Sequence, residues 1–159
     1  MDNIFIALEN IRSLYNVGSI LRSASFFGIK KILLVGYSGK LILPNGKAVL
    51  NEKLKKTALT SEMDIEIIML DSSDSMYDFA TENSLKLISI EQEQHAKPLT
   101  AENLENNVIY VLGNEVEGVS KLTITKSKRV LEIKHSTGHN SLNVATTAGI
   151  LFHVIASTN

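Results

Sequence analysis

Hydrophobic residues fall into short apolar runs that alternate with longer segments of helical periodicity. Six runs predict buried strands, over residues 5–8, 32–35, 65–70, 85–90, 108–112 and 130–133. Between and after them, apolar positions at helical spacing predict helices over residues 17–27, 48–55, 73–83 and 142–155. Continuous apolar strands that alternate with helices are typical of a mostly parallel sheet covered on both faces. We therefore expect a single α/β domain over residues 1–159.

Polar residues and glycines mark the ends of these elements. Asn16 is a candidate N-cap for the first helix, and Gly28 a candidate terminator. Residues 36–47 are rich in glycine and predict a loop. Ser141 and Asn143 are both candidates to cap the last helix.

Composition narrows the class of protein. The chain has 159 residues, 44% of them hydrophobic, which suits one globular core. It has no cysteine, which excludes disulfides, thiolate catalysis and cysteine metal sites. No apolar run approaches the ~20 residues of a membrane span. Residues 1–8 lack a basic segment ahead of an apolar stretch, so we expect a cytoplasmic protein without a secretory signal and without membrane association.

Charge is distributed unevenly, although the formal net charge is only −1. Residues 1–60 carry nine basic and three acidic side chains, residues 61–120 carry two and thirteen, and residues 121–159 carry five and one. If the two basic ends meet in the fold, they form a positive patch suited to phosphates. A solvated surface with chance asymmetry explains the charge pattern equally well.

Several familiar site motifs are absent. No G-x-G-x-x-G follows the first strand, and neither a phosphate loop nor a G-x-S-x-G elbow occurs. His135 and His139 are four residues apart, but the intervening Gly138 disfavours a helix and no carboxylate motif accompanies them. We expect no metal site.

Three polar segments, residues 10–24, 112–120 and 133–145, follow predicted strands. Ligands bind at the carboxyl edge of open α/β sheets, so these segments are candidates for one site. Gly18 and Arg22 are neighbours on one helix face, which leaves room beside the guanidinium for a planar or anionic group. Packing contacts, helix caps and solvated charges remain the alternative interpretation of each segment.

The order and spacing of these segments resemble the SpoU family, also called the TrmH family, of the SPOUT methyltransferases. The family patterns are N-x-G-x-x-x-R, L-G-x-E-x-x-G and S-L-N-[VL]. They are matched by Asn16, Gly18 and Arg22; by Leu112, Gly113, Glu115 and Gly118; and by Ser141, Leu142, Asn143 and Val144.

The resemblance implies a C-terminal deep trefoil knot, a homodimer, and S-adenosylmethionine (AdoMet) held by the knotted loops. The implied cofactor-binding residues are Ile90, Glu91, Leu112, Gly113, Asn114, Glu115, Gly118, Ile133, Lys134, His135, Gly138, Ser141 and Leu142. The implied reaction is methylation of an RNA ribose 2′-hydroxyl, in transfer or ribosomal RNA. It needs no metal.

The resemblance also implies roles for individual side chains. Arg22 would stabilise the developing alkoxide, since arginine is normally too basic to accept a proton. Asn16, Ser141 and Asn143 would position the ribose, and Glu115 would order the cofactor loop. The basic residues that are candidates for RNA binding are Arg12, Arg22, Lys53, Lys55 and Lys56.

The chain departs from the family pattern at one place. Ile133-Lys134-His135 stands where the family usually has Ile-Pro-Met. The missing proline frees the backbone of a cofactor loop, and histidine replaces an apolar contact. This leaves open a catalytically weak or inactive RNA-binding homologue of the same fold. A small α/β protein acting on a nucleotide or metabolite is a further alternative, which the missing phosphate loops disfavour.

Overall fold

The computed structural model describes residues 3–54, 65–134 and 141–158. Its centre is a seven-stranded sheet in the order β5-β2-β1-β8-β6-β9-β7, with every pairing parallel. The strands are β1 (Ile4–Glu9), β2 (Lys31–Val35), β5 (Glu66–Leu70), β6 (Lys86–Ile90), β7 (Lys97–Pro98), β8 (Val108–Leu112) and β9 (Arg129–Glu132). The predicted parallel sheet and its six predicted strands are thus confirmed.

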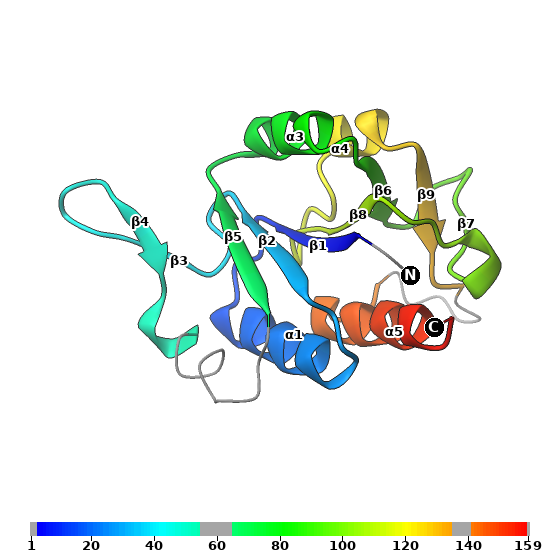
Figure 1. Ribbon diagram of the computed structural model, residues 1–159, viewed down its shortest axis with the longest axis horizontal. Helices are drawn as coiled ribbons and strands as arrows, with labels where there is room; N and C mark the ends of the chain where they lie inside the picture. Colours follow the sequence, from blue (N-terminus) through cyan, green and yellow to red (C-terminus); the bar gives the residue numbers. More distant parts are fainter. Residues whose placement is uncertain (1–2, 55–64, 135–140, 159) are drawn as a thin grey trace.

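Helices cover both faces of the sheet, as predicted. They are α1 (Leu14–Phe26), α3 (Ser73–Glu82), α4 (Lys121–Lys126) and α5 (Val144–Ala156), with a short 3₁₀ turn at Ala101–Asn103. In Figure 1, α1 and α5 lie side by side below the sheet, and α3 and α4 lie above it. The first and last helices of the chain therefore pack together.

Alternate side chains of the central strands enter one of two hydrophobic cores. In β1, Ile6 and Leu8 join the core under α1 and α5, whereas Phe5 and Ala7 join the core under α3. Successive strand residues point to opposite faces, so a strand covered on both faces needs an unbroken apolar run. This requirement explains why the strands were readable from the sequence.

The N-cap of the first helix lies three residues earlier than predicted. Ser13, not Asn16, is the N-cap, and its hydroxyl accepts a hydrogen bond from the backbone N–H of Asn16 at 3.2 Å. The prediction of Asn16 as the cap was wrong because its side chain is used in a long-range contact described below. Gly28 does end the helix: its φ of +75° and the bond from Ile29 N to Ala24 O form a glycine-dependent C-terminal motif.

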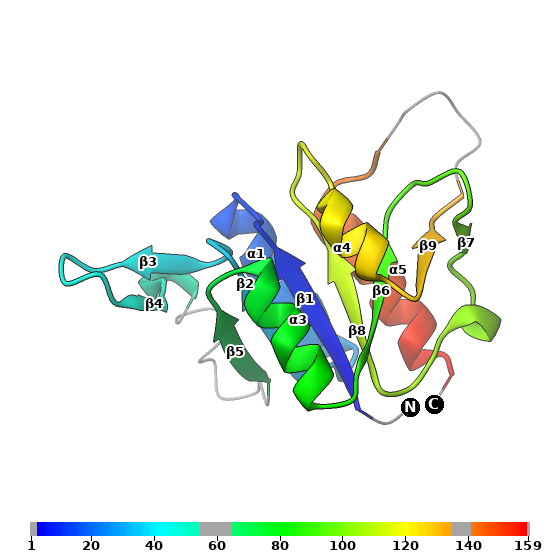
Figure 2. The same ribbon diagram turned by 90° about the horizontal axis from the view of Figure 1, so that it is seen from above.

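The predicted helix over residues 48–55 was also wrong for its first turn. Residues 40–50 instead form an antiparallel hairpin of β3 (Lys40–Ile42) and β4 (Ala48–Leu50). Residues 52–54 are helical, and residue 55 lies outside the described residues. Gly46, with a φ of +80°, lies in the turn of this hairpin. Figure 2 shows the hairpin projecting from the body of the molecule.

The predicted trefoil knot stays a prediction. The connection from β9 to α5 passes through residues 135–140, which lie outside the described residues. Within the described ranges, none of the helices has the length and apolar character needed to cross a bilayer.

At the amino-terminal edge of the sheet, Glu105 pairs with three basic side chains. Its Oε2 accepts hydrogen bonds from Lys128 Nζ at 2.7 Å and Lys86 Nζ at 3.1 Å, and its Oε1 lies 2.8 Å from Arg129 Nη2. The hydrogen bond from Lys128 is the largest of several effects that lower the pKa of Glu105 below its ordinary value of 4.5, against the opposing effect of burial.

Glu105→Gln is expected to destabilise the protein by about 1–3 kcal/mol at neutral pH, because the side chain is only 15% exposed and its loss leaves three cations facing one another. A depressed carboxyl pKa contributes stability that is present above the unfolded value of about 4.5 and is lost as pH falls through the lower folded value. Urea unfolding should therefore show a difference between wild type and variant that shrinks toward pH 3. A difference independent of pH would contradict this account.

Candidate active site

The three polar segments singled out in the sequence meet at the carboxyl edge of the sheet. Asn143 Nδ2 donates a hydrogen bond to Asn16 Oδ1 at 3.2 Å, and Asn16 Nδ2 donates to Glu115 Oε1 at 2.9 Å. These bonds connect residues 127 and 99 positions apart. One residue from each sequence motif thus belongs to a single hydrogen-bonded chain.

Glu115 connects the second motif to the start of α1. Its Oε2 accepts from Arg12 N at 2.9 Å, and its Oε1 accepts from Ser13 N at 3.0 Å as well as from the Asn16 side chain. Burial alone would raise the pKa of the Glu115 carboxyl, but the hydrogen bonds from Arg12, Asn16 and Ser13 outweigh it and the pKa is lowered. The carboxylate is therefore ionised and fully engaged in positioning the helix.

Asn143 has two tasks. Its Oδ1 caps α5 by accepting from Ala145 N at 2.8 Å, while its Nδ2 reaches Asn16. Of the two candidate caps, Asn143 is therefore the N-cap of α5 and Ser141 is not.

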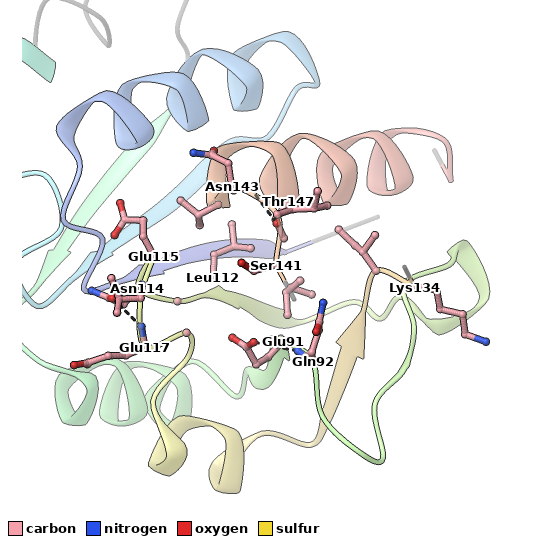
Figure 3. Close-up of a pocket in the computed structure, with 17 residues that line it drawn as sticks. Glu91, Gln92, Leu112, Asn114, Glu115, Glu117, Lys134, Ser141, Asn143 and Thr147 are labelled. Carbon is pink, nitrogen blue, oxygen red and sulfur yellow. Dashed lines mark hydrogen bonds between the residues drawn. The ribbon is translucent and has the colours of Figure 1, made fainter. Parts of the chain in front are cut away.

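A cavity of about 970 Å³ opens beside this chain of hydrogen bonds, between the ends of β6, β8 and β9 and the start of α5 (Figure 3). Eleven residues predicted to hold a cofactor line it: Ile90, Glu91, Leu112, Gly113, Asn114, Glu115, Gly118, Ile133, Lys134, Ser141 and Leu142. Two others, His135 and Gly138, lie outside the described residues.

Five residues that line the cavity were not predicted individually as site residues, namely Gln92, Val116, Glu117, Val144 and Thr147. Two of them lie inside the 112–118 segment, and Gln92 directly follows the predicted Glu91. Thr147 lies one helical turn beyond Asn143, and helical spacing was the signal that could have found it.

The loop after β8 folds back on itself. Asn114 and Gly118 exchange two backbone hydrogen bonds of 3.0 and 2.9 Å, and Asn114 Oδ1 accepts from Val116 N and Glu117 N. A Cβ placed on Gly113 would lie 2.1 Å from backbone atoms of Gly118 and Val119. The absence of a side chain at Gly113 is therefore required by its own loop, whereas the sequence had suggested a close approach to a ligand.

The lining of the cavity is acidic. Glu91 Oε2 accepts from Val119 N at 3.0 Å, and a Cβ on Gly118 would lie only 2.4 Å from that oxygen, so this glycine makes room for the carboxylate. Glu117 is a further lining carboxylate. The amino group of Lys134 points away from the other labelled side chains in Figure 3. The cavity thus favours a ligand that carries positive charge.

Arg22 does not line this cavity. Its side chain is exposed on α1, and none of the residues that the structure describes forms a hydrogen bond or ion pair with it. It shares the outer face of α1 with Tyr15 and Phe26, whose side chains are each 83% exposed. Within one protomer, the predicted catalytic residues Asn16, Glu115, Ser141 and Asn143 come together, and Arg22 stays outside.

The predicted RNA-binding residues are dispersed. Arg12 is exposed near the cavity, where hydrogen bonding to Tyr37 is the main effect that raises the pKa of its guanidinium. Lys53 lies in the short helical turn after β4, and Lys55 and Lys56 lie outside the described residues.

The two ends of the chain meet through α1 and α5, but their basic side chains do not gather there. Lys121 and Lys126 are on α4, which covers the opposite face, and Lys128 and Arg129 lie at the start of β9. Among the described residues, these four basic side chains therefore do not join a positive patch on α1 and α5.

No cluster of three or more histidine, aspartate or glutamate side chains suited to a metal ion occurs among residues 3–54, 65–134 and 141–158. That the reaction needs no metal stays a prediction.

Curated relatives cover nearly all of this chain. It is 22% identical over 151 residues to an uncharacterized tRNA/rRNA methyltransferase of Haemophilus influenzae, with 94% of this chain and 40% of the relative aligned. It is 25% identical over 154 residues to the 23S rRNA (guanosine-2′-O-)-methyltransferase RlmB of Xylella fastidiosa, with 96% and 58% aligned. The chain thus spans about half the length of these relatives or less.

Solved structures share the fold. The SpoU methyltransferase AviRb of Streptomyces viridochromogenes, solved in complex with AdoMet, superimposes with a TM-score of 0.76 at 19% identity over 98% of this chain and 60% of that one. The sequence model of the SpoU rRNA Methylase family matches residues 3–153 of this chain. A match over this length, together with the shared fold and the converging motifs, places the chain in the SpoU rRNA methylase family.

Proposed function

We propose that the protein transfers a methyl group from AdoMet to the 2′-hydroxyl of an RNA ribose. The observation that carries this proposal is the hydrogen-bonded chain of Asn143, Asn16 and Glu115, which joins all three motifs beside an acidic cavity. The 2′-O position is supported by the RlmB relatives, which are 23S rRNA (guanosine-2′-O-)-methyltransferases.

The cavity fits the cofactor in size and chemistry. Its volume of about 970 Å³ accommodates a drug-sized ligand. Leu112, Ile133 and Leu142 offer apolar contacts for an adenine ring, and the carboxylates of Glu91 and Glu117 suit a cationic ligand. When bound, AdoMet supplies an electrophilic methyl group on a sulfonium.

The protein's own residues hold and activate the ribose. The 2′-hydroxyl is a weak acid that would release its proton to solvent water as its oxygen takes the methyl group, with S-adenosylhomocysteine as the leaving group. The guanidinium of Arg22 would stabilise the negative charge that develops on the oxygen with its fixed donors. Asn16 and Asn143 keep the ribose in position. Glu115 positions the start of α1 and the cofactor loop, because its two oxygens accept hydrogen bonds from Arg12 N, Ser13 N and the side chain of Asn16.

A second copy of the chain completes the site. Arg22 lies outside the cavity of its own protomer, on a helix face that exposes Tyr15 and Phe26. Exposed aromatic residues around an arginine are typical of a protein interface. We infer a homodimer in which this face of α1 packs against the partner and Arg22 reaches the partner's cavity.

Phe26→Ser is expected to weaken the dimer at least about tenfold, because each protomer loses an aromatic contact that contributes about 1.5–3 kcal/mol. Sedimentation velocity over a dilution series measures the dissociation constant. Leu41→Ser, an exposed apolar position on the β3–β4 hairpin, is the matched control and should leave it unchanged. If the Leu41 variant dissociates while the Phe26 variant stays dimeric, the dimer interface lies on the hairpin and not on α1.

Gly113→Ala is expected to lower AdoMet affinity at least about tenfold, equivalent to about 1.4 kcal/mol. The added methyl group meets backbone atoms at 2.1 Å and must displace the 113–118 loop. Isothermal titration calorimetry measures the affinity, and circular dichroism checks that the variant remains folded. A folded variant with wild-type affinity would mean that this loop does not hold the cofactor.

The decisive test of the activity uses ribosomal and transfer RNA from cells that lack the gene. Incubation with purified protein and AdoMet should introduce a ribose methylation at a defined nucleotide, detected as resistance of one phosphodiester to alkaline hydrolysis. Methylation of a base instead would overturn the proposed 2′-O position. A protein that binds RNA but neither binds AdoMet nor modifies RNA would be the inactive homologue.

A further inference from the structure

A second cavity of about 690 Å³ lies next to the first at the carboxyl edge of the sheet. It is bounded by the ends of β1, β2 and β5, the base of the β3–β4 hairpin and the starts of α3 and α4. The side chain of Asn114 separates the two cavities: its Nδ2 donates to Asn10 O at 2.8 Å and to Tyr37 Oη at 2.9 Å. Asn10 and Tyr37 line the second cavity, whereas Asn114 lines the first.

The apolar side of this cavity consists of exposed large side chains. The described residues expose nine large hydrophobic side chains, and three of them, Tyr37, Ile42 and Leu122, line this cavity. Two more belong to the outer face of α1 and two to the first cavity. Apolar side chains that gather around a hollow mark a binding surface rather than chance exposure.

The polar side of the cavity disfavours a phosphate. Among the described residues that line it, Lys40 is the only basic one, and its side chain is 3% exposed and lies 3.5 Å from Asp71. Asp71, which is 89% exposed, and Asp74 add two carboxylates. The first turn of α3 is already capped by Ser72 and neutralised by Asp74. The cavity therefore suits a neutral ligand with N–H donors.

A neutral planar ligand with N–H donors, adjacent to a ribose methylation site, is an unpaired nucleobase. We propose that the second cavity binds the base of a nucleotide that flanks the methylated one, stacked on the ring of Tyr37 between Ile42 and Leu122, with Asp71 accepting hydrogen bonds from its edge. Single-stranded RNA is recognised by such stacking of splayed bases on aromatic side chains. This inference rests on the proposed function and assigns substrate recognition to the hairpin and α4.

The test measures RNA binding by fluorescence anisotropy. The probe is a labelled oligonucleotide that carries the nucleotide methylated by the wild-type protein with its neighbours on each side. Tyr37→Ala and Leu122→Ser should each raise the dissociation constant for RNA. For Tyr37→Ala, which loses the aromatic stack, the expected increase is about 5- to 150-fold. Tyr37→Phe keeps the ring and should retain most of the affinity. AdoMet affinity of Leu122→Ser should be unchanged, because this residue does not line the first cavity.

A second arm replaces one flanking base at a time by an abasic site. At one flanking position, the abasic substitution should weaken RNA binding by the wild-type protein. The same substitution should not weaken binding by Tyr37→Ala any further, as expected when the base and the ring are partners. If the wild type methylates RNA but neither the variants nor the abasic sites alter binding, this inference fails and the proposed function stands. A change only in self-association would assign the surface to a protein partner and overturn the inference. If the wild type methylates no RNA, the proposed function and this inference are both overturned.

Discussion

Arg22→Ala is expected to slow methyl transfer by about 100- to 1,000-fold, the range for losing one donor that stabilises a developing oxyanion. AdoMet affinity should stay near the wild-type value, because Arg22 is assigned to the ribose oxygen and the substitution leaves every residue that lines the cofactor cavity unchanged. Single-turnover transfer to the mapped RNA measures the rate, and calorimetry measures the affinity.

Arg22→Lys is the matched control. It keeps the charge but loses the planar donor arrangement, so its rate should fall between those of the wild type and the alanine variant. An alanine variant that transfers methyl groups at the wild-type rate would remove Arg22 from the mechanism.

Glu115→Ala is expected to destabilise the protein by about 2–3 kcal/mol and to reduce both AdoMet affinity and transfer. The change removes the acceptor of three hydrogen bonds, from Arg12 N, Ser13 N and the side chain of Asn16. Hydrogen bonds to a charged group contribute about 1.5–3 kcal/mol each, and water compensates part of the loss at the exposed amides. Urea unfolding and calorimetry measure the two effects.

Glu117→Ala provides the control for Glu115, since it removes an equal charge from the same loop without breaking those hydrogen bonds. Its free energy of unfolding should change by no more than about 0.5 kcal/mol. Equal destabilisation by both variants would show that loop charge, and not the contact with α1, accounts for the effect.

The sheet was predictable because its strands are buried on both faces and therefore read as unbroken apolar runs. The cap of the first helix was less predictable, since Ser13 and Asn16 are equally good capping residues. The choice between them depends on Glu115, which lies 99 residues from Asn16. Local sequence holds no record of such a contact.

The hairpin shows the same limit. Residues 48–50 belong to the segment that was predicted as a helix over residues 48–55. In the structure they pair with residues 40–42 across a short turn. Pairing between segments outweighs the local preference for helix, as it commonly does in short elements.

The motifs predicted the lining of the first cavity well, because loops after parallel strands converge at one sheet edge. They did not predict that Arg22 lies outside it. A helix position can be assigned to a face from its spacing, but whether that face meets its own cavity or a second copy depends on the assembly. The exposed aromatic rings of Tyr15 and Phe26, the neighbours of Arg22 on α1, indicate that this face meets a second copy.

Mixed dimers give the most direct test of an active site shared between two copies. With AdoMet held below the dissociation constant of the Gly113→Ala cavity, Arg22→Ala and Gly113→Ala should each show only a small residual activity alone. When the two variants are mixed and allowed to exchange, each mixed dimer combines an intact cavity with the partner's intact Arg22, and RNA 2′-O-methylation should return to about a quarter of the wild-type rate. If no activity returns although sedimentation shows mixed dimers, the arginine and the cavity do not come from different protomers, and the account is contradicted.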